Sequence, residues 1–208
     1  MSTRIRALAL VCTLNRSPEP SSSDKLARQV LEELEHQIDG TQLEHEVVRV
    51  VDHDVRFGVS PDEGDGDQWP AIREKVLASD IVVLATPIWM GQPSSVAKMV
   101  LERLDAEISE TDDQGRPVLF DKVAGVAVVG NEDGAHHVAA ECFQALSDVG
   151  FTIPPNGSTY WVGEAMQGTD YQDLDETPET TAGTTKTLAA NLAHLARLLR
   201  EMPYPPQG

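Results

Sequence analysis

Apolar and polar positions along the chain repeat a strand, loop and helix pattern, and the clearest unit lies in the middle. Residues 81–85 (IVVLA) form a short run rich in β-branched residues, typical of a strand buried on both faces. Between this run and a following helix lies the segment 86–93 (TPIWMGQP), which we expect to be a loop. Ser94 and Ser95 are candidate N-caps of that helix. Its apolar face consists of Val96, Met99, Val100 and Leu104.

The same unit opens the chain. Residues 4–12 predict a central first strand, and residues 13–25 a polar, hydroxyl-rich loop. The next helix has an apolar face from Leu26 to Leu34 and is expected to end near Gly40. A short second strand follows at residues 46–51.

Residues 52–68 then form a long acidic loop, and residues 69–78 the second helix. A loop of this length in a compact domain is usually functional or disordered. Residues 110–121 are polar and rich in turn formers, and residues 122–129 predict the fourth strand. The loop GNEDGAHH (130–137) follows it.

The C-terminal part completes the pattern. A helix with an apolar face from Val138 to Val149 ends before Gly150, and the fifth strand is expected in two pieces, residues 151–153 and 159–162. After the fifth strand we expect an acidic loop at residues 164–176, a helix at residues 184–200 and a loose tail at residues 203–208.

Five alternations of strand and helix, without a linker or repeat, predict one α/β domain over residues 1–208. We expect a doubly wound, five-stranded parallel sheet of order 2-1-3-4-5, with helices on both faces. In such sheets ligands bind outside the carboxyl ends of the strands, at the point where the strand order reverses. The loops after strands 1, 3 and 4 should therefore converge on one site.

Composition and charge limit the classes of partner that the protein can bind. The chain of 208 residues has a formal net charge of −18, which argues against nucleic acid and anionic membrane surfaces. Its start lacks a signal-peptide pattern and no run has the length of a membrane span, so we expect a cytoplasmic protein. Cys12 and Cys142 fall in apolar segments and are expected to be buried thiols. No CxxC or HxxxH motif is present, and we expect no metal site.

Two of the converging loops carry candidate chemistry. The first loop has no Walker motif and no GxGxxG fingerprint, but its hydroxyls precede a helix, an arrangement that can bind phosphate. Such hydroxyls are also common helix caps. The central segment places Ile88, Trp89 and Met90 together, which suits a flat apolar ligand, although packing under a neighbouring loop or subunit explains them equally well.

Three segments resemble one family, the flavodoxin-like NAD(P)H-dependent FMN reductases, in the branch with iron–sulfur flavoproteins and quinone reductases. They are TPIWMGQPSSVAKMVLERLD, GNEDGAHH and SSSDKLARQVL, the last with Ser22 and Ser23 at the Asn-Thr positions of the family. The chain departs from the family at residues 12–15, which read Cys-Thr-Leu-Asn instead of Gly-Ser-Pro-Arg. It has no cysteine in residues 52–68, which excludes the iron–sulfur cluster.

The resemblance implies an enzyme that passes a hydride from NADPH or NADH through bound FMN to a quinone, flavin or similar small acceptor. The flavin itself does the chemistry, so no catalytic residue is assigned, and His137 is a weak candidate. A homodimer or homotetramer with the site at a subunit edge is expected. The implied cofactor contacts are Thr13, Ser21, Ser22 and Ser23 for the phosphate, and Pro87, Ile88, Trp89, Met90, Gly91, Asn131, Glu132, Asp133, Gly134 and His137 for the ring.

Three alternatives stand beside this expectation. A flavodoxin-type electron carrier with a protein partner fits the acidic charge, and a scaffold without flavin is another possibility. The sequence VCTLNRSP resembles the loop of low-molecular-weight phosphatases, but that chemistry needs five residues between cysteine and arginine. Cys12 and Arg16 have three residues between them, which argues against a phosphatase.

Overall fold

The protein is described by a computed structural model covering residues 4–38, 43–165 and 167–206. Its centre is a sheet in the order β2-β1-β3-β5-β6, in which every neighbouring pair is parallel. This confirms the predicted flavodoxin-like order 2-1-3-4-5. The strands are β1 (Ile5–Val11), β2 (Leu43–Arg49), β3 (Ile81–Trp89), β5 (Val123–Gly130) and β6 (Ser158–Val162), and a short β4 (Gln92–Pro93) pairs antiparallel with the end of β3.

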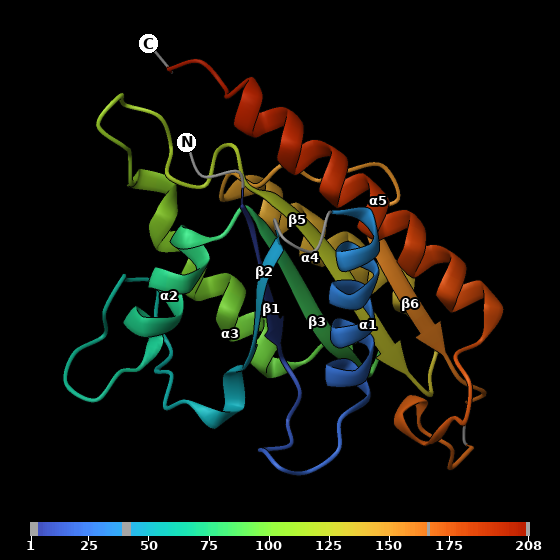
Figure 1. Cartoon of the computed structure of the whole chain (residues 1–208). Coiled ribbons are helices and arrows are strands. Elements are labelled where there is room, and N and C mark those ends of the chain that lie inside the picture. The colour runs from blue at the N-terminus through green and yellow to red at the C-terminus, as the bar shows by residue number, and fades with distance from the viewer. Residues whose placement is uncertain (1–3, 39–42, 166, 207–208) are drawn as a thin grey trace.

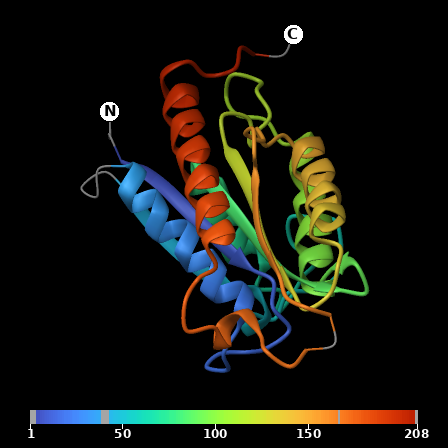
Figure 2. The same cartoon turned by 90° about the vertical axis from the view of Figure 1, so that its right-hand side faces the viewer.

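Helices cover both faces of the sheet (Figures 1 and 2). On β1, Ala7 and Ala9 pack in one core with α1 and α5, whereas Leu8 and Leu10 pack in a second core with α2, α3 and α4. Burial on both faces explains why the strands read as continuous apolar runs. The helices are α1 (Ser22–Gln37), α2 (Trp69–Ala78), α3 (Ser95–Leu104), α4 (Ala135–Asp148) and α5 (Glu179–Glu201), with short 3₁₀ turns at Val50–Asp52, Asp105–Ser109 and Tyr171–Asp173.

The main difference from the predicted elements is at the end of β3. The strand continues to Trp89, through the segment that we expected to be a loop. Its neighbour β1 ends at Val11, opposite Ala85, so the missing N–H of Pro87 leaves no β1 ladder bond unmade. β2 also begins earlier than expected, and of the predicted piece 151–153 only Thr152 forms a bridge, with Val123. The predicted helix end at Gly40 lies outside the described residues.

A buried serine joins three elements at the carboxyl end of the sheet. Ser94 is the N-cap of α3, as predicted, and its Oγ accepts a hydrogen bond from Ala97 N at 3.1 Å. The same hydroxyl donates to the carbonyl oxygen of Cys12, just after β1, at 2.6 Å. Ser94 N donates to Oγ1 of Thr86 on β3 at 3.0 Å. The end of β1, the end of β3 and the start of α3 are therefore linked through one residue.

The tail expected to be loose is held at Tyr204. Its N–H donates to Asp121 at 2.7 Å, its hydroxyl lies 3.1 Å from that of Thr152, and its ring packs edge-on against Phe120 at 5.5 Å. The last two residues, 207 and 208, lie outside the described part of the chain.

Among the described helices, none is both long and apolar enough to cross a membrane.

Candidate functional site

A cavity of about 410 Å³ lies at the carboxyl ends of β1, β3, β5 and β6, where the sequence places the site. This volume is within the range of small-molecule sites. The structure brings most of the predicted binding residues together here. Those that line the cavity are Thr13, Ser21, Ser22, Ser23, Pro87, Ile88, Trp89, Asn131 and Glu132.

Three hydroxyls of the first loop and of the start of α1 are set to donate into the cavity. Thr13 Oγ1 accepts a hydrogen bond from Asn15 N at 3.3 Å, and Ser21 Oγ accepts one from Asp24 N at 3.3 Å. Ser22 Oγ accepts one from Gln172 N at 3.2 Å. Because each oxygen already accepts a backbone N–H, its own proton remains available for an anion. Together with the positive end of α1, this donor set fits a phosphate group.

The first loop is held in place from the β2 side. Ser17 donates to both oxygens of Asp52, from its N at 2.8 Å and its Oγ at 2.6 Å, and these bonds keep the pKa of Asp52 below its usual range. Arg49 donates to the carbonyl oxygen of Glu19 at 2.7 Å, so it supports the backbone of the loop. No lysine or arginine is found among the described residues that line the cavity. A bound phosphate would therefore depend on neutral donors.

A hairpin turn forms the rim. Met90 and Gly91 join β3 to β4, and both have positive φ, +52° and +72°. Two-residue hairpin turns of type I′ require this combination, which favours glycine and strains methionine. Trp89 lines the cavity, whereas Met90 is 88% exposed and Gly91 does not line it. The backbone N–H of Met90, one of the residues expected to contact the ring, donates to Glu132 Oε1 at 2.8 Å.

The turn after β5 packs directly on this hairpin. A Cβ on Gly134 would lie 3.0 Å from the Cα of Gly91, closer than most side chains approach, and the φ of Gly134, +125°, also favours glycine. Asp133 accepts from Gly134 N at 2.7 Å. Asp133 and Gly134 thus shape the turn without lining the cavity, whereas Asn131 lines it and donates to Asp170 at 2.6 Å.

His137 faces a neighbouring groove and not the cavity. Its Nε2 lies 3.0 Å from Glu141 Oε1 and 2.9 Å from the side-chain amide of Gln92. The groove has a volume of about 1190 Å³ and shares Leu14 and Trp89 with the cavity. Met90 lies on the groove as well. Of the predicted ring contacts, Met90 and His137 therefore lie on the groove. Gly91, Asp133 and Gly134 line neither the groove nor the cavity.

Sequence reasoning missed one wall of the cavity, formed by Trp161 of β6 and residues 170–172. The rings of Trp161 and Tyr171 lie 5.4 Å apart, and Tyr171 is fully buried, which raises the pKa of its hydroxyl. β6 is at the edge of the sheet, so its loop was not counted among those that converge. The available signal was the pair of aromatic residues at and after the carboxyl end of this strand.

The cysteine of the phosphatase alternative is inert. Cys12 is fully buried and its thiol lies 3.7 Å from the carbonyl oxygen of Leu10. Burial raises the pKa of Cys12 well above its usual value, which disfavours the thiolate that a nucleophile requires.

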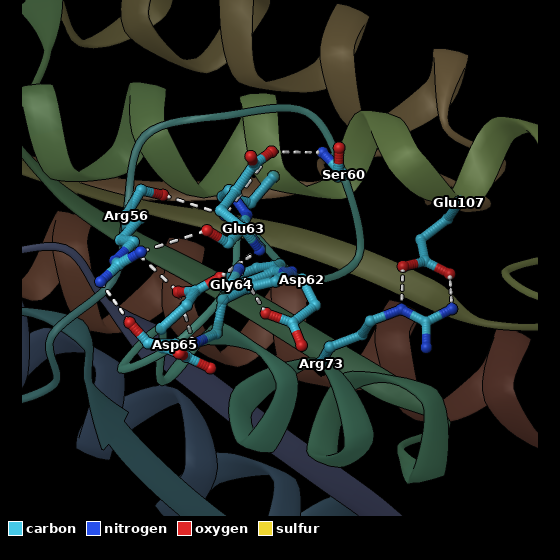
Figure 3. A network of polar contacts seen from close by, with 11 residues as sticks. Arg56, Ser60, Asp62, Glu63, Gly64, Asp65, Arg73 and Glu107 are labelled. Carbon is cyan, nitrogen blue, oxygen red and sulfur yellow. Dashed lines mark hydrogen bonds and ion pairs between the residues drawn. The ribbon is translucent and has the colours of Figure 1, made fainter.

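The long acidic loop is fixed by a polar network (Figure 3). Buried Arg103 of α3 donates to Asp67 Oδ2 at 2.7 Å and to the carbonyl oxygen of Arg56 at 3.1 Å. The side chain of Arg56 in turn donates to the carbonyl oxygens of Glu63 and Asp65. The loop is thus an ordered structure outside the cavity.

Comparison with known proteins places the chain among flavin enzymes. The family described as NADPH-dependent FMN reductase matches residues 5–167. The chain is 37% identical, over 96% of its own length and 80% of the other, to an 8-demethyl-8-aminoriboflavin-5'-phosphate synthase of Streptomyces davaonensis. It is 39% identical, over 94% of its length, to a protein of Mycobacterium bovis named divalent metal cation transporter MntH, of which it spans only 29%.

Two solved structures show the same architecture. The crystal structure of RosB with bound 8-demethyl-8-formylriboflavin-5'-phosphate has a TM-score of 0.84 and 37% identity, covering 96% of this chain and 82% of that one. An NADH:FMN oxidoreductase in its apo form has a TM-score of 0.63 and 18% identity, covering 98% and 94%. The second comparison shows the fold alone.

Proposed function

Because this chain belongs to the NADPH-dependent FMN reductase family, we propose that it passes a hydride from NAD(P)H, through FMN bound in the cavity, to a small acceptor such as a quinone or a flavin. It is an FMN-dependent oxidoreductase of the flavodoxin-like fold with NAD(P)H as reductant. The nature of the acceptor is the proposed part.

The single observation that carries the proposal is the donor set of the cavity. Thr13, Ser21 and Ser22 present hydroxyl protons beside the N-terminus of α1, where they would bind the phosphate. Trp89 and Trp161 line the same cavity and would exclude water from an apolar ring. When bound, FMN supplies the redox chemistry, and the residues of the chain supply position and electrostatics.

The test is an NAD(P)H oxidation assay on purified protein reconstituted with FMN, with and without a quinone. We expect a flavin spectrum and oxidation of NADH or NADPH that increases when the quinone is added. Oxidation that requires a protein partner instead would favour a flavodoxin-type electron carrier. Protein that remains colourless after incubation with FMN would contradict the proposal.

A second candidate function is favoured by the 37% identity to the Streptomyces davaonensis synthase. In this second function, a flavin phosphate is the substrate that the enzyme modifies. The same hydroxyls would hold the phosphate of that substrate. Mass spectrometry of the flavin recovered after turnover separates the two functions. An unchanged FMN mass with sustained NAD(P)H oxidation supports the reductase, whereas a changed mass supports a flavin-modifying enzyme.

We also propose that the protein is a homodimer or homotetramer. Trp89 is 51% exposed and Met90 is 88% exposed, and both border the groove beside the cavity. Exposed apolar side chains gathered in one place are typical of interaction surfaces. A second subunit on this surface would cover the rim of the cavity.

A further inference from the structure

Glu132 links the two turns at the rim of the cavity. It lies in the loop between β5 and α4, and its Oε1 accepts a hydrogen bond from Met90 N in the β3–β4 hairpin at 2.8 Å. The two residues are 42 positions apart in the chain. Among the described residues, Glu132 is the side chain that bonds the Met90 N–H. The hairpin is therefore supported by a residue from outside it.

The hairpin needs an external support because its conformation is strained. Met90 has a φ of +52°, a strained region that non-glycine residues rarely adopt. Its side chain is 88% exposed and contributes little stabilising packing. The hydrogen bond from Met90 N to the Glu132 carboxylate offsets this strain.

The charge of Glu132 is unusual at this place. The charged residues that line the cavity are Glu132 and Asp170, and the described lining contains no lysine or arginine. A carboxylate here opposes the binding of a phosphorylated ligand by a protein whose net charge is already −18. A neutral glutamine could accept the same hydrogen bond. The negative charge is therefore not required by the turn alone.

We propose that Glu132 is a positioning residue for the flavin, which fixes the Met90–Gly91 turn at the rim and holds a negative charge beside the ring. A reduced flavin has gained electrons, so a nearby carboxylate disfavours it and lowers the reduction potential of bound FMN. The inference rests on the proposed function, because it requires FMN in this cavity.

The experiment compares wild type with Glu132→Gln, which keeps an acceptor and removes the charge, and Glu132→Ala, which removes both. Glu102→Gln is the matched charge control, since the half-buried Glu102 of α3 pairs with Lys98 at 3.7 Å and lines neither the cavity nor the groove. Hydrogen exchange of the Met90 amide is measured by NMR on the protein without added flavin. The FMN dissociation constant and the midpoint potential are measured on the loaded protein.

We expect the Met90 amide to exchange about tenfold faster or more in Glu132→Ala and to stay protected in Glu132→Gln. The midpoint potential should rise in both Glu132 variants and stay unchanged in Glu102→Gln. FMN binding should weaken in Glu132→Ala only.

Two results would overturn the inference. One is Met90 exchange in Glu132→Ala equal to that of wild type, which would show that the carboxylate does not hold the turn. The other is a midpoint potential in Glu132→Gln equal to that of wild type, which would show that its charge does not act on the flavin. If wild type binds no FMN at all, the proposed function fails, and the amide exchange still decides whether Glu132 supports the turn.

Discussion

Lys25 clamps Tyr171 onto helix α1, with its Nζ 5.1 Å from the centroid of the Tyr171 ring and 3.1 Å from the carbonyl oxygen of the same residue. The amine also donates to the carbonyl oxygen of Leu174 at 3.0 Å. Of this segment, Tyr171 and Gln172 line the cavity, and Gln172 N donates to Ser22 Oγ at 3.2 Å. One charged side chain therefore holds a segment almost 150 positions away against the hydroxyls at the start of α1.

Replacing Lys25 with methionine should release this wall. The stem of the side chain is kept, but the donors are lost, and we expect FMN binding to weaken about tenfold or more. Lys75→Met on α2 is the control, because Lys75 pairs with Glu46 and lines neither the cavity nor the groove. Titration of both proteins with FMN is the measurement. Equal affinity in Lys25→Met and wild type would show that the clamp is not needed for binding.

The serines of α1 should select FMN over riboflavin. Hydrogen bonds to a charged group contribute about 1.5–3 kcal/mol each, so loss of both Ser22 and Ser23 should cost on the order of 3–6 kcal/mol for FMN, less where water compensates. Riboflavin should bind weakly to wild type and be little affected by the double alanine variant. Titration with both flavins tests this. Raising salt should tighten FMN slightly, since it screens repulsion from a protein of charge −18.

Gly91→Val should lose FMN because of backbone strain. The φ of Gly91 is +72°, and a Cβ there meets no atom within 4 Å, so the penalty comes from the conformation and not from a clash. Gly115 has nearly the same φ, +74°, and equally open space, but it lies outside the β3–β4 hairpin. Gly115→Val is thus a matched control, expected to lower the melting temperature similarly while retaining FMN. Retention of FMN by both variants would contradict the prediction.

We expect the acidic loop to lose stability at low pH, because Asp67 becomes protonated there. Burial alone raises the pKa of Asp67. The N–H groups of Glu63, Trp69 and Arg56 and the charge of Arg103 together have the larger, opposite effect, so the pKa lies below its usual value. A lowered pKa in the folded state stabilises the protein above the unfolded pKa, about 3.9, and this contribution disappears as pH falls through the folded pKa.

Asp67→Asn separates this effect from general acid unfolding. At neutral pH the variant should be less stable by about 3–5 kcal/mol, because Arg103 is left buried without its carboxylate. The difference in melting temperature between wild type and variant should shrink below about pH 4. A difference that stays constant from pH 7 to pH 3 would exclude Asp67 as the group responsible.

The oligomer is tested by light scattering. We expect a mass that is a multiple of 22.6 kDa at micromolar concentration, with the groove beside Trp89 and Met90 covered. A monomer with full activity would contradict this expectation.

The parts predicted correctly depend on local pattern. Ser94 is a cap because it precedes a helical apolar face, and the strand order follows from the alternation of strands and helices. The continuation of β3 through Pro87 could not be read from the sequence, since it depends on where the neighbouring strand ends. Trp161 was missed because its strand lies at the edge of the sheet. The aromatic residues at and after the end of this strand were a signal, but the three-dimensional arrangement is needed to show that they reach the cavity.

The hydroxyl of Ser94 has a consequence for how the family can vary. Since it bonds the carbonyl oxygen of Cys12 and its backbone bonds Thr86, the loop that would take the phosphate and the hairpin that would take the ring start from one shared anchor. The distance between the starting points of these two regions is therefore fixed by the hydrogen bonds of one residue. The lengths of the two loops beyond this anchor can change without altering the distance between their starting points.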